Sequence, residues 1–221
     1  MNPNKSRKRR PRKKKSNSKK IILIVALLAV VVTIVVAYMM LGNNNPNENG
    51  PSGDNTSSKM KVLFETSMGD ITIQLRDDMP ITTTNFKNLV QDGTYDNTIF
   101  HRVKEEFMIQ GGDPMGTGVG DPSIPNIQDE FSSVAENNKN KRATIAMANK
   151  GQQYPNSGSS QFFINVVYNN HLDNLHPVFG DVIDGMDVVD AISLVLTDGD
   201  PPAGNNKPLE DVVLIRATLI D

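Results

Sequence analysis

The residues best suited to chemistry lie in the stretch Phe100–Asp113, which reads FHRVKEEFMIQGGD. Its single arginine, Arg102, keeps its charge and presents a rigid fork of hydrogen-bond donors. Strand alternation would put Phe100 and Arg102 on one face of the first run, and Met108 and Gln110 on one face of the second. The polar run between them predicts a hairpin turn. An arginine beside apolar and amide side chains suits peptide binding better than acid–base chemistry.

Apolar and amide-bearing residues elsewhere in the chain extend this arrangement. The strand run Gln161-Phe162-Phe163 cannot bury both phenylalanines on one side, so Phe163 is expected to line a groove. Phe100, Phe162 and Phe179 are assigned to the core. The candidate pocket walls are Phe107, Met108, Phe163 and Leu172, and the candidate polar guides are Arg102, Gln110, Asn149, Gln161 and His176.

Three other kinds of site fit the sequence less well. A zinc site could use His171 and His176, but no third ligand accompanies them in their Pro-bounded loop. A serine hydrolase could use the serines in the range 157–160, but none lies in a Gly-x-Ser-x-Gly elbow. The glycine-rich range 114–122 lacks the Lys-Ser/Thr pair and the helix of a phosphate-binding loop. The chain has no cysteine, which excludes thiolate nucleophiles and disulfides.

The surrounding pattern predicts many short strands and two helices. The helix at Pro80–Gly93 would be capped by threonines and would bury Phe86, Leu89 and Val90. A second helix is expected at 184–195 from apolar residues three positions apart. The expected strands are 62–66 and 71–75, which form a hairpin, the two runs of Phe100–Asp113, then 143–148, 161–167 and 212–220. We therefore expect a closed, mostly antiparallel barrel capped by helices.

Charge divides the chain into unlike parts. Residues 1–20 hold eleven basic side chains and no acidic one, whereas residues 59–221 hold 12 basic and 23 acidic side chains. Such asymmetry indicates that the two parts meet different surroundings. The acidic surface of residues 59–221 argues against nucleic acid as a partner. We expect 1–20 to be a cytoplasmic tail, 42–58 a flexible polar linker, and 59–221 the globular domain.

Residues 21–41 form an uncharged apolar run between the tail and the linker. As a helix this run would be about 31 Å long, which is enough to cross a bilayer. It exceeds the apolar core of a usual signal peptide and ends in a poor cleavage site, so we expect an uncleaved signal anchor. The basic flank predicts a cytoplasmic N-terminus, a domain outside the membrane, and contact between the tail and anionic lipid.

Several motifs together resemble the cyclophilin-type peptidyl-prolyl cis-trans isomerases. The motifs of this resemblance are Phe100-His101-Arg102, Phe107-Met108-Ile109-Gln110-Gly111-Gly112-Asp113, Ala146-Met147-Ala148-Asn149, Ser160-Gln161-Phe162-Phe163-Ile164, Leu172-Asp173 and His176-Pro177-Val178-Phe179-Gly180. They occur in the family's order and cover about residues 61–221. The resemblance implies an eight-stranded antiparallel barrel closed by a helix at each end, with the active site on its outer surface and no metal or other cofactor.

The family's site residues carry over to matching positions of this chain. The resemblance implies that Arg102 is the catalytic arginine and that the four candidate walls form a proline pocket. It implies that Gln110, Asn149, Gln161 and His176 hold the substrate backbone, with Ala148 and Gly116 nearby in the groove. His171 replaces the family's tryptophan beside the pocket leucine, which predicts weak binding of cyclosporin-like ligands. Lys150 and a longer loop at 150–160 also depart from the common pattern.

The predicted activity is isomerisation of X-Pro bonds in secreted or cell-surface polypeptides, in a bacterial cell. The unaided reaction crosses a barrier of about 18–20 kcal/mol, because twisting the bond removes amide resonance. The hypothesis is that Arg102 donates a hydrogen bond to the proline nitrogen or carbonyl that strengthens only in the twisted state. The alternative is a proline-peptide binding module or scaffold that does not catalyse turnover.

Overall fold

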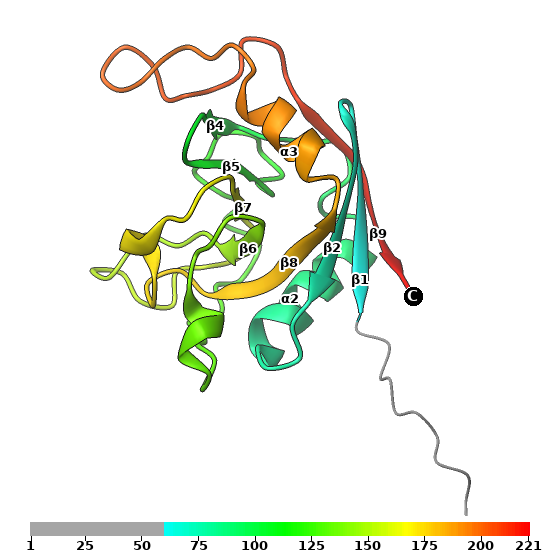
Figure 1. Ribbon diagram of the computed structural model, residues 1–221, viewed down its shortest axis with the longest axis vertical. Helices are drawn as coiled ribbons and strands as arrows, with labels where there is room; N and C mark the ends of the chain where they lie inside the picture. Colours follow the sequence, from blue (N-terminus) through cyan, green and yellow to red (C-terminus); the bar gives the residue numbers. More distant parts are fainter. Residues whose placement is uncertain (1–59) are drawn as a thin grey trace, which may run out of the picture. The chain divides into compact units, whose positions relative to one another are not determined.

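The computed structural model describes residues 60–221, which form one antiparallel sheet with two α-helices (Figure 1). The strands are β1 Lys61–Thr66, β2 Gly69–Leu75, β3 Thr98–Ile99, β4 Arg102–Lys104, β5 Met108–Gly111, β6 Thr144–Met147, β7 Phe162–Asn165, β8 Val178–Asp184 and β9 Val213–Ile220. The α-helices are α2 Pro80–Gln91 and α3 Met186–Ser193, and the 3-10 helices are η1 Ala135–Asn138 and η2 Asn170–Leu172.

The tail, anchor and linker expected at 1–20, 21–41 and 42–58 lie outside the described residues. Within the part that the structure describes, neither α-helix has the length and apolarity needed to cross a membrane.

The sheet has nine strands in the order β3-β9-β1-β2-β8-β6-β7-β5-β4, and every pairing is antiparallel. The predicted count of eight is wrong because the chain around Phe100 is divided into two short strands, β3 and β4. These two strands follow each other in the chain, yet they lie at opposite edges of the sheet. An isolated bridge joins Ile99 of the edge strand β3 to Asp113, which follows β5 next to the opposite edge. The sheet therefore curves around on itself and encloses a core.

The core is dominated by aromatic side chains from elements far apart in the sequence. Phe86 of α2 packs with its ring centroid 4.9 Å from that of Phe179 and 5.9 Å from that of Phe162. Phe64 and Tyr95 complete the cluster, and all five side chains are fully buried. Aromatic pairs at such separations add to the stabilisation from burial alone. The assignments of Phe162 and Phe179 to the core are confirmed.

Two local predictions fail for identifiable reasons. The threonine cap of α2 is wrong: Met79 is the N-cap and makes no side-chain capping bond. Glu130 instead accepts hydrogen bonds from the backbone N–H groups of Ile81 (3.1 Å) and Thr82 (2.9 Å). A carboxylate at this end satisfies free N–H donors and favours the helix dipole. Because Glu130 is distant in sequence, local pattern cannot reveal this cap.

The predicted shared face of Phe100 and Arg102 is also wrong. Phe100 belongs to the buried core, with its ring 6.4 Å from that of Phe162. Arg102 lies on the groove side of the sheet. The alternation of a strand does not apply between them, because β3 ends at Ile99 and β4 begins at Arg102. The hairpin of β4 and β5 itself is confirmed, with Arg102 opposite Gln110.

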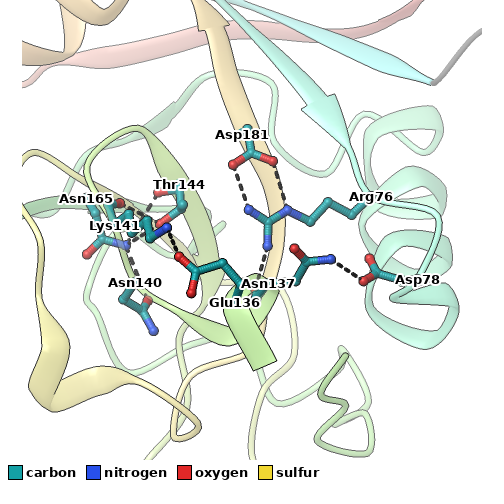
Figure 2. A network of polar contacts seen from close by, with 9 residues as sticks. All are labelled: Arg76, Asp78, Glu136, Asn137, Asn140, Lys141, Thr144, Asn165 and Asp181. Atoms are coloured by element: carbon teal, nitrogen blue, oxygen red, sulfur yellow. Dashed lines mark hydrogen bonds and ion pairs between the residues drawn. The ribbon is translucent and has the colours of Figure 1, made fainter. Parts of the chain in front are cut away.

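A polar network fixes the segment around η1 to the barrel wall (Figure 2). Arg76, which follows β2, makes a two-pronged ion pair with Asp181 of β8 at 2.8 and 2.7 Å, and it also donates to the carbonyl of Asn137. The Asn137 side chain donates to Asp78 at 2.7 Å. Two-pronged pairs of this kind hold their partners in a defined orientation. The long connection between β5 and β6 is thereby attached to the sheet.

Candidate active site

A pocket of about 150 Å³ lies on the face of the sheet opposite the main core, over β4, β5 and β7. Side chains alternate between the two faces: Ile109 and Phe162 point into the core, while Gln110 and Phe163 point to the pocket. The pocket is lined by Arg102, Phe107, Met108, Gln110, Ala148, Asn149, Phe163, Leu172 and His176. Nine of the twelve candidate site residues are thus brought together.

Strand register accounts for the central part of this lining. Arg102 is paired with Gln110 across β4 and β5, and Gln110 is paired with Phe163 across β5 and β7. The three side chains therefore form a row across neighbouring strands. Phe163 also belongs with Met108 to a small apolar cluster, in which the two side chains are 4% and 1% exposed. The row places a cation and an amide at the edge of an apolar pocket.

Arg102 is half-buried, and its donors are only partly engaged. Its Nη1 lies 3.5 Å from Oε1 of Gln110, and its guanidinium carbon lies 5.6 Å from the centre of the Phe107 ring. No ion pair among residues 60–221 includes it. Burial lowers the pKa of Arg102, and the carboxylate of Asp200 acts in the opposite direction. Arginine remains protonated at neutral pH even so, so it can donate to a bound molecule.

A chain of side-chain amides connects Arg102 to the loop that follows Asp113 and contains Gly118. Gln110 Nε2 donates to Oε1 of Gln161 at 3.0 Å, and Gln161 Nε2 donates to the carbonyl of Gly118 at 3.2 Å. Gln161 therefore lies just beyond the pocket and contacts it through Gln110. These amides offer paired donor and acceptor groups along the rim, as the backbone of an extended peptide requires.

Asp113 holds this loop in place from a fully buried position. Its carboxylate accepts hydrogen bonds from the backbone N–H groups of Met115, Thr117, Gly118 and Gly120, at 2.7–3.3 Å. Burial opposes ionisation of Asp113, but these hydrogen bonds outweigh it and hold the pKa of Asp113 below its ordinary value. The charged form of Asp113 therefore organises the loop that supports Gln161.

The opposite wall comes from the segments around β6 and η2. His176 lies with its Nδ1 3.2 Å from the carbonyl oxygen of Met147 and its ring edge-on to Phe163, 5.4 Å between centroids. Burial lowers the pKa of His176, which keeps its ring neutral at pH 7. Asn149 Nδ2 donates to the carbonyl of Leu175 at 2.9 Å. This wall therefore consists of neutral groups in fixed orientations.

Three candidate residues lie outside the pocket lining. Gln161 borders it, as described. His171 stacks on Phe107 with 5.7 Å between ring centroids and an interplanar angle of 22°. Gly116 lies beside Ile99 in the loop that Asp113 organises. The sequence-based reasoning overlooked Gly118, whose carbonyl binds Gln161, and the role of Asp113. An aspartate before a glycine-rich run was the available signal for both.

A second, larger pocket of about 580 Å³ adjoins the first. The two pockets share Gln110, Ala148 and Asn149, so they lie side by side along the same surface. Lys150 lines this second pocket, where the sequence departs from the usual small residue. Within residues 60–221, no three side chains of His, Cys, Asp or Glu gather closely enough to hold a metal ion.

Comparison with known proteins agrees with this geometry. The model of the family described as cyclophilin type peptidyl-prolyl cis-trans isomerase/CLD matches residues 61–219. Peptidyl-prolyl cis-trans isomerase CYP71 of Arabidopsis thaliana is 42% identical over 167 residues, covering 74% of this chain and 25% of that protein. Peptidyl-prolyl cis-trans isomerase-like 1 of Aspergillus oryzae is 39% identical over 161 residues, covering 72% of this chain and 95% of that protein.

A solved cyclophilin type peptidyl-prolyl cis-trans isomerase from Cryptosporidium parvum has the same fold. It superposes with a TM-score of 0.66 and is 30% identical, covering 74% of this chain and 98% of its own. The fold and the groove therefore define a peptide-binding isomerase scaffold. The chain belongs to the cyclophilin-type peptidyl-prolyl cis-trans isomerases. As a member of this family it is an enzyme of the peptidyl-prolyl isomerase class.

Proposed function

We propose that this enzyme isomerises X-Pro bonds without covalent chemistry, with Arg102 stabilising the twisted amide. The observation that carries the proposal is the arginine itself: it is half-buried, outside every described ion pair, and at the edge of an apolar pocket. A relative of the same fold has been crystallised in the presence of the dipeptide Ala-Pro, which supports a proline-containing peptide as the substrate.

The reaction needs no bond to the enzyme. As the X-Pro bond twists, resonance is lost and the proline nitrogen regains its lone pair. A hydrogen bond from Arg102 to that nitrogen or to the proline carbonyl becomes stronger in this twisted state, which lowers the barrier. Phe107, Met108 and Phe163 hold the proline ring, while Gln110 and Asn149 hold the chain that precedes it. The three apolar side chains fix the ring. The carbonyl group just before the proline rotates about the X-Pro bond.

The cellular setting is part of the same proposal. Residues 21–41 would anchor the chain in a bacterial membrane, with the basic residues 1–20 in the cytoplasm beside anionic lipid and the enzyme domain outside. There it would act on X-Pro bonds of secreted or cell-surface polypeptides, whose slow isomerisation delays folding. The acidic domain would not bind nucleic acid. Because histidine stands at position 171, cyclosporin-like ligands would bind weakly.

The test of the proposed reaction is an isomerase assay on an X-Pro peptide, by protease coupling or exchange NMR, over a range of pH. We expect acceleration with a kcat/KM that is constant from about pH 7 to pH 9, because no proton transfer is involved. Burial keeps the pKa of His176 below 6.5, so the histidine stays neutral over this range. A kcat/KM that changes tenfold across this range would contradict the mechanism.

The topology has a separate test. Protease added to intact spheroplasts is expected to remove the domain, while a cytoplasmic marker protein remains intact. Protection of the domain until the membrane is lysed would overturn the extracytoplasmic assignment without affecting the proposed reaction.

A further inference from the structure

Two walls of the pocket lie on segments with little secondary structure of their own. Leu172 ends η2, a 3-10 helix of three residues, and His176 lies in the turn before β8. The segment is closed by local backbone hydrogen bonds, such as those from the N–H groups of Leu175 and His176 to the carbonyl of Leu172 at 3.1 and 3.2 Å, and 3-10 geometry makes such bonds poorer than those of an α-helix. These bonds shape the turn, but its placement against the sheet depends on contacts from outside the segment.

Asn140 supplies those contacts from beneath the segment. It is fully buried, and its Nδ2 lies 3.0 Å from the carbonyl oxygen of Leu172 and 3.4 Å from that of His176. Its backbone N–H donates to the Asp173 carboxylate at 2.7 Å, and its backbone carbonyl accepts from the N–H of Asn169 at 2.9 Å. One side chain and its backbone thus fix both ends of the turn that carries Leu172 and His176.

A second buried asparagine ties Asn140 to the sheet. Asn165, at the end of β7, is fully buried, and its Nδ2 donates to Oδ1 of Asn140 at 3.2 Å and to Oγ1 of Thr144 at 2.9 Å. Figure 2 shows Asn165 between Asn140 and Thr144, which begins β6. The turn is therefore joined through Asn140 to two neighbouring strands.

The same network reaches the third wall. Asn169 is 4% exposed, and its Nδ2 donates to Oδ1 of Asn165 at 2.7 Å and to the carbonyl oxygen of Phe107 at 2.9 Å. Phe107 lies in the connection between β4 and β5. Three buried amides therefore hold the backbones of Phe107, Leu172 and His176 relative to one another. Buried networks in which each member has its partners are rigid and specify one arrangement.

We infer that Asn140 and Asn169 are positioning residues for the proline pocket, and that Asn165 joins them. The inference rests on the proposed function, because it assumes that this pocket holds the proline ring. No hydrogen bond of the three side chains in residues 60–221 goes to Arg102. If Phe107, Leu172 and His176 are less well fixed, the pocket binds the proline ring more weakly, and it does so equally in the planar and the twisted state. The effect therefore falls on KM and leaves kcat unchanged.

The test uses the full chain with Asn140→Ala and, separately, Asn169→Ala. We expect KM and the Kd for an Ala-Pro-containing peptide to rise about 5- to 10-fold in each variant, with kcat within about twofold of wild type. Assays are run well below each variant's Tm, so that all molecules are folded. If Asn140→Ala does not fold, Asn169→Ala still tests the inference. It leaves Asn140 intact and removes the hydrogen bond that holds the backbone of Phe107.

The matched control is Asn138→Ala. Asn138 is also a buried asparagine, 5% exposed, but its side chain bonds only to the backbone of Ser132. We expect it to lower Tm and leave KM unchanged. If the Asn140 and Asn169 variants behave in the same way, or lower kcat at constant KM, the inference is overturned. The wild-type rate tests the proposed function, whereas the ratio of variant to wild-type Kd tests this inference.

Discussion

Replacing Arg102 by alanine is expected to reduce kcat/KM for X-Pro isomerisation by about 100- to 1000-fold, the usual cost of removing one transition-state donor. The loss corresponds to about 3–4 kcal/mol of transition-state stabilisation. It should appear in kcat and kcat/KM alike, because the hydrogen bond from Arg102 strengthens only as the amide twists. The peptide's Kd should change little, since Phe107, Met108 and Phe163 still hold the ring.

Two further variants make this result interpretable. Arg102→Lys keeps the charge but loses the fork of donors, and we expect only partial recovery of kcat. Arg216→Ala is the matched control, because Arg216 is an exposed arginine on β9 paired with Glu65 at 2.6 Å, and kcat/KM should not change. If wild type and Arg102→Ala bind the peptide equally and neither accelerates isomerisation, the chain is a binding module.

Replacing Phe163 by alanine is expected to raise KM at least about tenfold, because the substrate loses the apolar surface that holds its ring. Phe163 is 4% exposed and packs with Met108, Ala146 and Val178 in the cluster beneath the pocket. Its truncation should also lower the free energy of unfolding by about 3–5 kcal/mol. Peptide titration and urea unfolding measure the two effects separately.

Phe131→Ala provides the comparison for this second result. Phe131 is 39% exposed and does not line the pocket. We expect neither its KM nor its unfolding midpoint to change appreciably. A Phe163→Ala variant that loses stability while keeping a wild-type KM would show that Phe163 only fills space beneath the groove.

Regular local patterns made much of the fold predictable from the sequence. Two short β-rich runs separated by Ser67–Asp70 identified the hairpin of β1 and β2, and the apolar spacing of α3 identified that helix. The seven-residue strand β8, in contrast, was not predicted. Its third residue, Gly180, is of a type that usually interrupts a strand, but a side chain there would come within 2.8 Å of the carbonyl oxygen of Gln74. The glycine allows neighbouring strands to approach, and that requirement appears only once the sheet is assembled.

The candidate site was predictable to the extent that its residues project directly from strands. Arg102, Gln110 and Phe163 follow from register once β4, β5 and β7 are paired. The residues that support the site were not predictable in the same way. Asp113 acts through the backbone of a loop, and Asn140 acts through the carbonyls of a turn more than thirty positions away. Contacts to backbone groups place little constraint on the partner's residue type. The glycine-rich run after Asp113 gives a local signal for its role, but nothing near Asn140 in the sequence indicates the turn that it holds.

The order of strands in the sheet determines when the sheet can assemble during synthesis. β9, the last strand of residues 60–221, lies between β3 and β1, which are synthesised well before it. Until its eight residues are available, both neighbours present unpaired edges that can pair with other chains. The sheet therefore cannot close until β9 has been synthesised. A chain cut short before Val213 is exposed to the same aggregation that an isomerase helps its substrates to avoid.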